Sequence, residues 1–279
     1  MSELTRREAV ELPEPVRSAV VYALSTGGKR LRGMLVLAAY QAAGGKEDAS
    51  GLGAAVEVIH SYSLVHDDLP CMDDDDMRRG QPSTHRAFSI PVATRAGAAM
   101  IPLAARVAAR AASDLRLPAT ASDTIVKVLM QGAGAGGMIG GQLRDLAAEG
   151  RVLSRDDLDR IHGSKTGALI SASVKIGGIA ANVAKPGLDA FGHYGESIGL
   201  AFQIMDDVLD VTGSSARLGK TAGRDAELGK STYPALHGVE GAVKRAAALV
   251  DDGCNALRKQ NLLTGELESL ADFIVSRSH

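Results

Sequence analysis

Two stretches of the chain gather aspartates at the end of an apolar segment. The first, HDDLPCMDDDDMRRG, runs from His66 to Gly80 and holds six aspartates, with two arginines directly behind them. The second is DDVLD, in which Asp206 and Asp210 are one helical turn apart, so that their carboxylates project from one face of a helix. Like charges at this spacing destabilise a bare helix, so the simplest alternative for either stretch is a solvated acidic surface.

The surroundings of DDVLD argue against a surface position. The segment is rich in apolar side chains, namely Phe202, Ile204, Met205, Val208, Leu209 and Val211. Carboxylates in such surroundings need cations nearby. The first stretch is placed similarly, because Asp67 and Asp68 end an apolar helix that Pro70 interrupts. The two acidic groups can therefore face each other from separate helices across a cavity.

Oxygen-only ligands of this kind suit Mg²⁺, which keeps several waters and is usually shared between protein carboxylates and substrate phosphates. No set of histidines and cysteines indicates zinc instead, and Cys71 and Cys254 lie far apart and form no CxxC motif. The sequence thus predicts a magnesium site and, with it, a phosphate-bearing substrate.

Cationic side chains for such a phosphate are abundant beside the glycines and the acidic stretches. They are Lys29, Arg30, Arg32, Arg78, Arg79, Lys165, Lys220, Arg224 and Lys230. Arginine offers a planar fork to phosphate oxygens, whereas lysine acts as a mobile point charge. Any one of these residues alone is more simply a surface charge. Their recurrence next to glycines and aspartates is what favours phosphate binding.

The elements that position these groups are expected to be helices. Aromatic residues are only 3% of the chain, alternating strand patterns are scarce, and Ala, Leu, Val and Ile recur at spacings of three and four residues. The clearest helices are predicted over 33–43, 53–65, 156–161 continuing through 168–184, 188–211 and 241–259.

Glycine, proline and serine interrupt this pattern at 44–46, 70, 81–83, 117–120, 185–187 and 212–215, which leaves about ten helices. Helices this apolar must pack on several neighbours. We therefore expect an all-α fold, in which a single large helical bundle forms one domain over residues 1–279.

Charge and composition exclude several classes of protein. A net charge of −2 and the lack of any Lys/Arg run with aromatics argue against nucleic-acid binding. The N-terminus lacks the apolar stretch of a signal peptide, and no uncharged apolar run is long enough to be an integral membrane segment. With two distant cysteines, a soluble protein of the reducing cytoplasm is expected.

Three short matches to other motifs are accidental. Gly132, Gly134 and Gly137 satisfy GxGxxG, but no predicted strand precedes them. Residues 195–199 satisfy GxSxG, but both flanks of that segment look helical. The segment GRDAELGKS at 223–231 misses the Walker A spacing by one residue. Neither dinucleotide binding, a nucleophile elbow nor a P-loop is therefore expected.

Taken together and in order, the motifs resemble those of the trans-isoprenyl diphosphate synthases, particularly the bacterial farnesyl diphosphate synthases. The matching segments are GGKRLR, EVIHSYSLVHDDLPCMDDDDMRRG, GGQ, SKTGALI, FQIMDDVLD and LGKTAGRDAELGKSTYPAL, which span nearly the whole chain. The resemblance implies a helical bundle around a deep cavity, usually as a homodimer, with the two aspartate stretches on opposite walls. It also implies that isopentenyl diphosphate is joined head-to-tail and in trans to dimethylallyl or geranyl diphosphate, with several Mg²⁺ ions in the site.

The resemblance assigns roles to individual residues. The implied metal ligands are Asp67, Asp68, Asp73, Asp206, Asp207 and Asp210. Contacts to the allylic diphosphate are implied for Arg78, Lys165, Thr166, Gln203, Lys220 and Lys230. Contacts to isopentenyl diphosphate are implied for Lys29, Arg32, His60 and Arg79. The residues implied as directly catalytic are Asp67, Asp68, Arg78, Lys165 and Lys220. His60 and Asp67 are two helical turns apart, so one helix can serve both substrates.

The growing chain is expected to run from the first aspartate stretch along the helix that carries it. Tyr62 and Ser63 lie five and four residues before Asp67, where a bulky ring blocks the tunnel. In the resembling family, an aromatic residue at the Tyr62 position together with the two-residue expansion in DDLPCMD goes with a C15 product. We therefore expect farnesyl diphosphate, with the C20 geranylgeranyl diphosphate as the alternative.

The chain departs from the family pattern at two places. Gly33 follows GGKRLR where the family usually has proline. The segment ATRAGAAM at 93–100 stands where the family usually reads close to AILAGDAL, with Arg95 for an apolar residue, Ala98 for the aspartate, and Pro102 shortly after. This second segment is expected to help form the tunnel wall, so the departure bears on product length.

Two other functions compete with a synthase. A terpene cyclase also ionises a prenyl diphosphate in a helical cavity, but it needs no second diphosphate site of the kind that GGKRLR and His60 suggest. A non-catalytic partner subunit is expected to lose aspartates or lysines from its motifs, and this chain keeps them.

Overall fold

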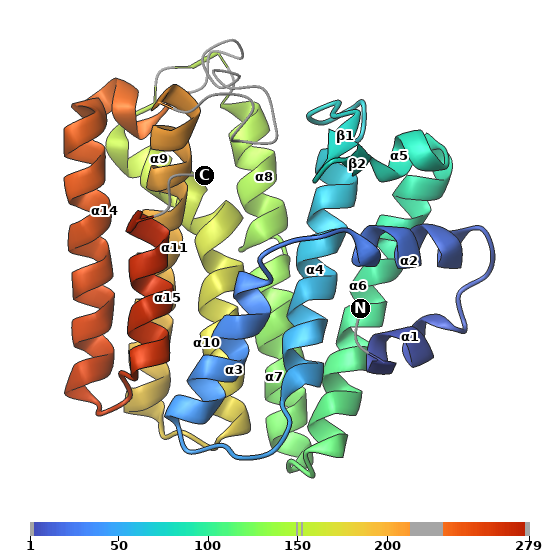
Figure 1. The fold of residues 1–279 in the computed structure, drawn as a ribbon, viewed down its shortest axis with the longest axis horizontal. Helices are drawn as coiled ribbons and strands as arrows, with labels where there is room; N and C mark the ends of the chain where they lie inside the picture. The colour runs from blue at the N-terminus through green and yellow to red at the C-terminus, as the bar shows by residue number, and fades with distance from the viewer. Residues whose placement is uncertain (1–2, 149, 152, 213–230, 277–279) are drawn as a thin grey trace.

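The computed structural model is an assembly of helices that stand side by side (Figure 1) and describes residues 3–148, 150–151, 153–212 and 231–276. Within these residues the β-structure is limited to one antiparallel hairpin, β1 Met77–Arg78 and β2 Gln81–Pro82. The fold is all-α, as predicted. The hairpin was not predicted, and its second strand occupies the expected break at 81–83.

The helices of the described part follow one another closely along the chain. They are α1 Glu3–Ala9, α2 Val16–Ser25, α3 Leu31–Ala42, α4 Ser50–Asp67, α5 Thr84–Ala87, α6 Ile90–Asp114, α7 Ala119–Ala133, α8 Met138–Ala147, α9 Arg155–His162, α10 Ala168–Ala180, α11 Lys185–Thr212, α14 Tyr233–Lys259 and α15 Gly265–Ser276. A π-helical segment, η1 Gly163–Gly167, joins α9 to α10. Among these residues, no helix is both long and apolar enough to cross a lipid bilayer.

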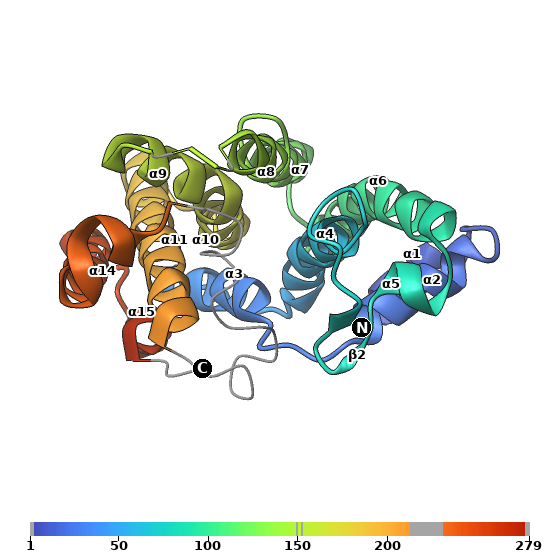
Figure 2. The ribbon, with the colours of Figure 1, turned by 90° about the horizontal axis from the view of Figure 1, so that it is seen from above.

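Two hydrophobic clusters form the core. One contains Ile59, Met100 and Leu129 of α4, α6 and α7, and the other contains Phe191 and Leu257 of α11 and α14. Helices α3 and α10 contribute to both clusters and lie between the two groups of helices when the molecule is seen from above (Figure 2). The aspartate stretches therefore belong to different halves of the core, because the first follows α4 and the second lies in α11.

Side-chain caps fix where four helices begin. Ser89, Ser154, Thr232 and Thr264 each accept a hydrogen bond at their side-chain oxygen from the backbone N–H three residues later. The cap at Thr232 starts α14 at residue 233, well before the predicted start at 241. A break at Gly238, with φ 71° and ψ 163°, explains why the periodic pattern was clear only after it.

Other predicted boundaries also need correction. The helix predicted to continue to 184 ends at Ala180, and Asn182 after it has a φ of 58°. The break predicted at 185–187 is the first turn of α11, where Pro186 is tolerated because that turn needs no N–H donor there. Pro102 lies inside α6, which continues past it.

The dismissed motifs lie where no such motif can function. Gly132 and Gly134 end α7, and Gly137 precedes α8 with no strand before them. Ser197 is buried within α11 rather than exposed at a strand-to-helix turn. The structure thus confirms that these two matches are accidental, while the Walker-like segment lies largely outside the described residues.

Candidate active site

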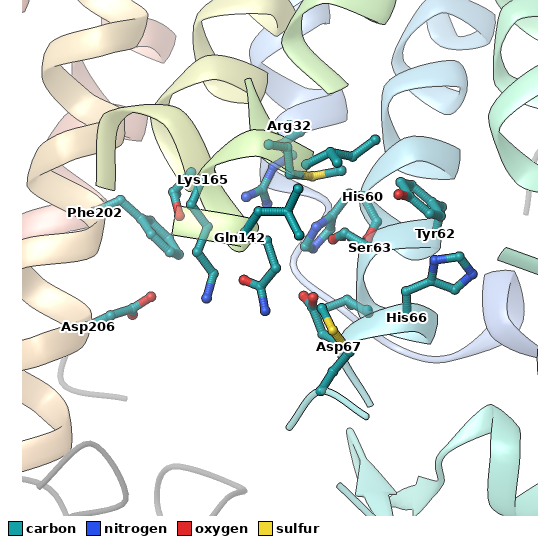
Figure 3. A pocket seen from close by; sticks show the side chains of 16 residues that line it. Arg32, His60, Tyr62, Ser63, His66, Asp67, Gln142, Lys165, Phe202 and Asp206 are labelled. Atoms are coloured by element: carbon teal, nitrogen blue, oxygen red, sulfur yellow. Dashed lines mark hydrogen bonds between the residues drawn. The ribbon is translucent and has the colours of Figure 1, made fainter. Parts of the chain in front are cut away.

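A cavity of about 400 Å³ opens between α4, α8, η1 and α11. Figure 3 shows Asp67 and Asp206 on opposite sides of it, with the ends of the Lys165 and Gln142 side chains between them. Apolar side chains such as Phe202 share the lining. One aspartate of each stretch therefore faces the same cavity from a separate helix.

Asp67 is the last residue of α4, and its carbonyl oxygen accepts a hydrogen bond of 2.9 Å from the backbone N–H of Asp73. This contact folds the second half of the acidic stretch back against the helix end. Burial raises the pKa of the Asp67 carboxyl from 3.8 to about 6, while the charge of Lys165 lowers it and that of Asp73 raises it. A carboxylate in this position gains stability from a cation.

Asp68 has a different environment from its neighbour. It is buried, and Arg78 donates to its Oδ1 from Nε at 2.9 Å and also from Nη2. The same Nη2 donates to Asp75 Oδ2 at 3.1 Å. The structure thus places Asp68 and Arg78 in a charge-assisted cluster beside the cavity and not on its lining.

The β1–β2 hairpin separates the two arginines of the first stretch. Its two-residue turn is Arg79 and Gly80, with φ values of 54° and 78°, as the tightest hairpin turns require. Arg78, at the end of β1, donates to Asp68, whereas Nη2 of Arg79, in the turn, lies 3.5 Å from Nε2 of His60.

Positive charge gathers around His60. Burial, followed by the charges of Arg32 and Arg79, holds the pKa of His60 well below its ordinary 6.5, so its ring is neutral at pH 7. The guanidinium of Arg79 lies over Gly28, where a Cβ atom would be 2.5 Å from Nη1. Both His60 and Arg32 line the cavity. The positive charge around His60 therefore favours binding of an anion in this part of the site.

A buried carboxylate supports this cationic group. Glu57, 8% exposed, accepts a hydrogen bond of 2.9 Å at Oε1 from the backbone N–H of Gly33, and its Oε2 lies 3.6 Å from Nη1 of Arg30. Arg30, whose φ is 51°, also donates to the carbonyl oxygen of Thr26 at 2.7 Å. Proline has no N–H, so Gly33 makes a contact that the proline usual in the resembling family cannot make.

Lys29 lies elsewhere. Its ammonium is 4.9 Å from the centroid of the Phe273 ring on α15, and it does not line the cavity. The structure therefore does not bring Lys29 together with Arg32, His60 and Arg79 on the lining, and its contact with isopentenyl diphosphate remains a prediction.

The SKTG segment forms η1, an insertion of the type often found at functional sites. Nζ of Lys165 donates to Asp145 Oδ2 at 2.7 Å, and the charges of Asp145 and Asp67 raise its pKa against the effect of burial. Close packing positions this segment. A Cβ at Gly141 would be 2.2 Å from the backbone nitrogen of Lys165, and one at Gly199 would be 2.5 Å from the Cα of Gly167. Lys165 and Thr166 both line the cavity.

The three aspartates of the second stretch are in different positions. Asp206 lines the cavity. Asp207 is 3% exposed and accepts hydrogen bonds from the backbone N–H of Tyr233 at 3.0 Å and from Nε2 of Gln203 at 3.4 Å. Asp210 is 4% exposed and is not on the lining. In this structure the Asp207 carboxylate is engaged at the start of α14, and its assignment as a metal ligand stays a prediction.

Gln203 is likewise engaged within the protein. Its Oε1 accepts a hydrogen bond of 2.9 Å from the hydroxyl of Thr166. Together with Asp207 it forms a chain of hydrogen bonds from η1 through α11 to α14. Thr166 reaches the cavity lining, but Gln203 does not.

Tyr62 and Ser63, predicted to limit chain length, both line the cavity (Figure 3). The hydroxyl of Ser63 donates to the carbonyl oxygen of His60 at 2.9 Å. Of the atypical segment on α6, Arg95 and Ala98 are exposed and do not line the cavity. The expectation that these two substitutions shape the tunnel wall is therefore not supported by their positions.

Lys220, Lys230 and Arg224 lie outside the described residues. Within the described ranges, no group of three or more His, Cys, Asp or Glu side chains is arranged to hold a metal ion by itself. Asp67 and Asp206 nevertheless offer carboxylate oxygens, the donors that a hard divalent cation prefers, from opposite sides of the cavity.

Several residues of the site were missed by sequence reasoning. Gln142 is 7% exposed and lines the cavity, and neither polar atom of its amide has a hydrogen-bond partner among the described residues. Asp145 is three residues further along α8 and pairs with Lys165. Glu57 is three residues before His60 on α4. The sequence did hold a signal for two of them. Glu57 is a polar residue one helical turn before His60 in an apolar helix, and Gln142 directly follows the paired glycines Gly140 and Gly141.

Comparisons with known proteins agree with this site. Residues 13–261 match the family described as polyprenyl synthetase. The chain is 46% identical to a farnesyl diphosphate synthase of Escherichia coli, over 95% of this chain and 90% of that one. It is 40% identical to a geranylgeranyl diphosphate synthase of Cyanophora paradoxa, over 96% and 89%. Among solved structures, a geranyltransferase of Helicobacter pylori complexed with magnesium and isoprenyl diphosphate has a TM-score of 0.81 at 29% identity, over 95% of this chain and 88% of that one.

Proposed function

The chain belongs to the polyprenyl synthetase family and is a trans-prenyltransferase, and from this we propose that it makes farnesyl diphosphate. The substrates are isopentenyl diphosphate and an allylic diphosphate, either dimethylallyl or geranyl, which are joined head-to-tail. The observation that carries the proposal is the placement of Asp67 and Asp206 on facing walls of one cavity, with Lys165 between them and the cationic group around His60 beside them. A cyclase or a non-catalytic subunit is not retained, since the two relatives described above are synthases.

Asp67 and Asp206 are the carboxylates best placed to hold Mg²⁺, several ions of which are proposed per site. When bound, the ions supply positive charge to the departing diphosphate. Asp68, Asp73 and Asp210 remain proposed ligands, although Asp68 is paired with Arg78 in this structure.

Cationic side chains are proposed to bind the two diphosphates separately. Lys165 and Arg78, with Thr166, contact the allylic diphosphate, and Lys220 and Lys230 are expected to join them. Arg32, His60 and Arg79 contact isopentenyl diphosphate, with Lys29 as a further contact. Because His60 is neutral, it can donate a hydrogen bond to this anion without adding a further positive charge to those of the surrounding arginines.

The apolar part of the cavity is proposed to exclude water from the allylic cation, which water would otherwise quench. Phe202, Met138 and Ile139 supply apolar surface close to the charged groups. Tyr62, buried at the lining, is proposed to stop the chain at C15. The relatives include both C15 and C20 synthases, so geranylgeranyl diphosphate is the second candidate product.

We further propose that the chain acts as one catalytic domain, forms a homodimer and works in the cytoplasm without nucleic-acid partners. The match to a single family over residues 13–261 supports the first point. Sedimentation of the purified protein tests the second, with twice the mass of one chain expected.

The decisive experiment is to incubate the protein with Mg²⁺, isopentenyl diphosphate and dimethylallyl, geranyl or farnesyl diphosphate in turn. Products are then separated by chain length. We expect farnesyl diphosphate from the first two primers and little extension of the third, with no product when a chelator removes the metal. Absence of condensation with every primer would contradict the synthase proposal, whereas a mainly C20 product would contradict only the assignment of chain length.

A further inference from the structure

His66 connects the lining of the cavity to the neighbouring helix α6. It lies on α4 between Tyr62 and Asp67, and it lines the cavity itself. Its Nε2 is 3.1 Å from the backbone carbonyl oxygen of Thr94 on α6. A carbonyl oxygen can only accept, so Nε2 carries the proton in this contact. The ring is therefore held from one side by the backbone of another helix.

On its other side, the His66 ring contacts Tyr62. The ring centroids are 4.9 Å apart and the planes are inclined by 74°, an edge-to-face arrangement that aromatic rings favour. Figure 3 shows both rings next to each other beside α4. Tyr62 lies one helical turn before His66, so the contact restricts how the tyrosine ring can tilt at the lining.

Space for the His66 ring depends on a glycine of α6. A Cβ atom at Gly97 would lie 2.1 Å from Nε2 of His66 and 2.3 Å from its Cδ2, closer than any real contact. Gly97 and Thr94 belong to one turn of α6. One turn of that helix thus provides both the space for the ring and the acceptor that fixes it.

We propose that His66 is a positioning residue for product length, which holds the ring of Tyr62 across the path of the growing chain and is itself held by Thr94 and Gly97 of α6. This inference rests on the proposed synthase function. Each condensation forms one carbon–carbon bond to isopentenyl diphosphate, releases diphosphate and a proton, and lengthens the chain by one isoprene unit. His66 takes no part in that chemistry. His66 instead determines the length at which the end of the growing prenyl chain meets the ring of Tyr62.

The test is the ratio of C20 to C15 product, measured with geranyl diphosphate and isopentenyl diphosphate. In His66→Ala the ratio is expected to rise about 3- to 10-fold, the scale of one lost aromatic contact. Thr94→Ala is the matched control, because it keeps the backbone carbonyl and removes only an exposed hydroxyl that bonds to Ile90 within α6. Its ratio is expected to equal that of the wild type.

A second variant leaves the imidazole in place. Gly97→Ala puts a methyl group where the His66 ring lies, so the ring must shift, and we expect the ratio to rise as in His66→Ala. The double variant Tyr62→Ala/His66→Ala is expected to match Tyr62→Ala alone, because His66 acts through the tyrosine ring. A purely structural role for His66 would lower thermal stability but would not move this ratio.

The outcomes separate clearly. An unchanged ratio in both His66→Ala and Gly97→Ala overturns the inference, as does a double variant whose effect is the product of the two single effects. Loss of all condensation in both variants also overturns it, since it assigns His66 to product length and not to turnover. A wild-type protein that condenses no primer contradicts the proposed function instead.

Discussion

At the scale of single residues, identical carboxylates have different tasks because their neighbours differ. Asp206 and Asp207 are adjacent on α11, yet the first lines the cavity and the second accepts hydrogen bonds from Tyr233 and Gln203. Asp67 and Asp68 divide in the same way between the cavity and Arg78. In each pair of adjacent aspartates, one carboxylate therefore faces the cavity in this structure and the other accepts hydrogen bonds from the protein.

This division predicts opposite effects of two neighbouring substitutions. Asp206→Ala is expected to lower kcat/KM by about 100-fold or more, the scale for losing one group that stabilises developing charge, with little change in stability. Asp207→Ala removes the buried acceptor of the Tyr233 N–H at the start of α14 and is expected to cost about 1–2 kcal/mol of unfolding free energy. Steady-state kinetics and urea unfolding of both variants check this. Equal stability of the two variants would contradict the structural role of Asp207.

Gln142 gives a second prediction at this scale. Its buried amide has no hydrogen-bond partner among the described residues, which costs stability. Gln142→Met keeps the length of the side chain and removes the polar atoms, so we expect the free energy of unfolding to rise by about 1 kcal/mol. Turnover is expected to fall, because the amide faces the cavity. Thermal unfolding and product formation measure the two effects, and a variant that is both less stable and fully active contradicts the prediction.

At the scale of elements, long apolar helices were predictable and their irregular joints were not. The periodic pattern located α3, α4 and α11 because apolar residues recur at spacings of three and four along each helix and are buried in the core. The π-helical η1 and the β1–β2 hairpin leave no such period, because both are short and depend on contacts with distant segments. The aspartates, the arginines and the lysine motif could be recognised in the sequence. Their partners could not: Asp145 pairs with Lys165, Glu57 lies beside Arg30, and the backbone N–H of Tyr233 donates to Asp207.

Packing between α9 and α14 predicts a dependence on pH. Burial, aided by Lys165 and opposed by Asp145, lowers the pKa of His162 from 6.5 to about 4, and its ring stacks on Tyr233. The neutral ring is thus favoured in the folded state, and its contribution is complete above pH 6.5 and lost as the pH falls towards 4. The loss is on the order of 3 kcal/mol.

His162→Phe keeps a ring against Tyr233 but cannot be protonated. Its unfolding free energy is therefore expected to fall less between pH 6.5 and 4 than that of the wild type, as measured by urea unfolding at several pH values. Parallel curves for the two proteins would show that His162 is not responsible for the acid sensitivity.

At the scale of the whole molecule, the site joins two halves of the core. Asp67 ends a helix of one hydrophobic cluster and Asp206 belongs to a helix of the other, with the cavity between them. The apolar composition predicted a helical bundle, and the two aspartate stretches predicted a cavity between separate helices. It could not predict that the core divides in two, because that depends on which helices pack together rather than on how apolar each one is.

A ligand that contacts both halves is expected to stabilise the folded protein. With Mg²⁺ and an unreactive allylic diphosphate analogue at about 100 times its dissociation constant, the gain is about 2.7 kcal/mol, which corresponds to a rise in Tm of several degrees. Either component alone is expected to give a smaller shift, and EDTA is expected to abolish the joint effect. In Asp206→Ala the joint shift is expected to disappear. A full shift without metal contradicts the proposed bridge.

The glycines around η1 have a consequence for engineering the enzyme. Gly141 and Gly199 bring the backbones of α8 and α11 against Lys165 and Gly167 so closely that no side chain fits. Leu143, by contrast, lines the cavity while 61% exposed. In a saturation library screened for altered products, we expect almost no replacement to be tolerated at the two glycines. At position 143 we expect nearly every replacement to be tolerated. A library for altered products can therefore keep Gly141 and Gly199 unchanged and vary position 143.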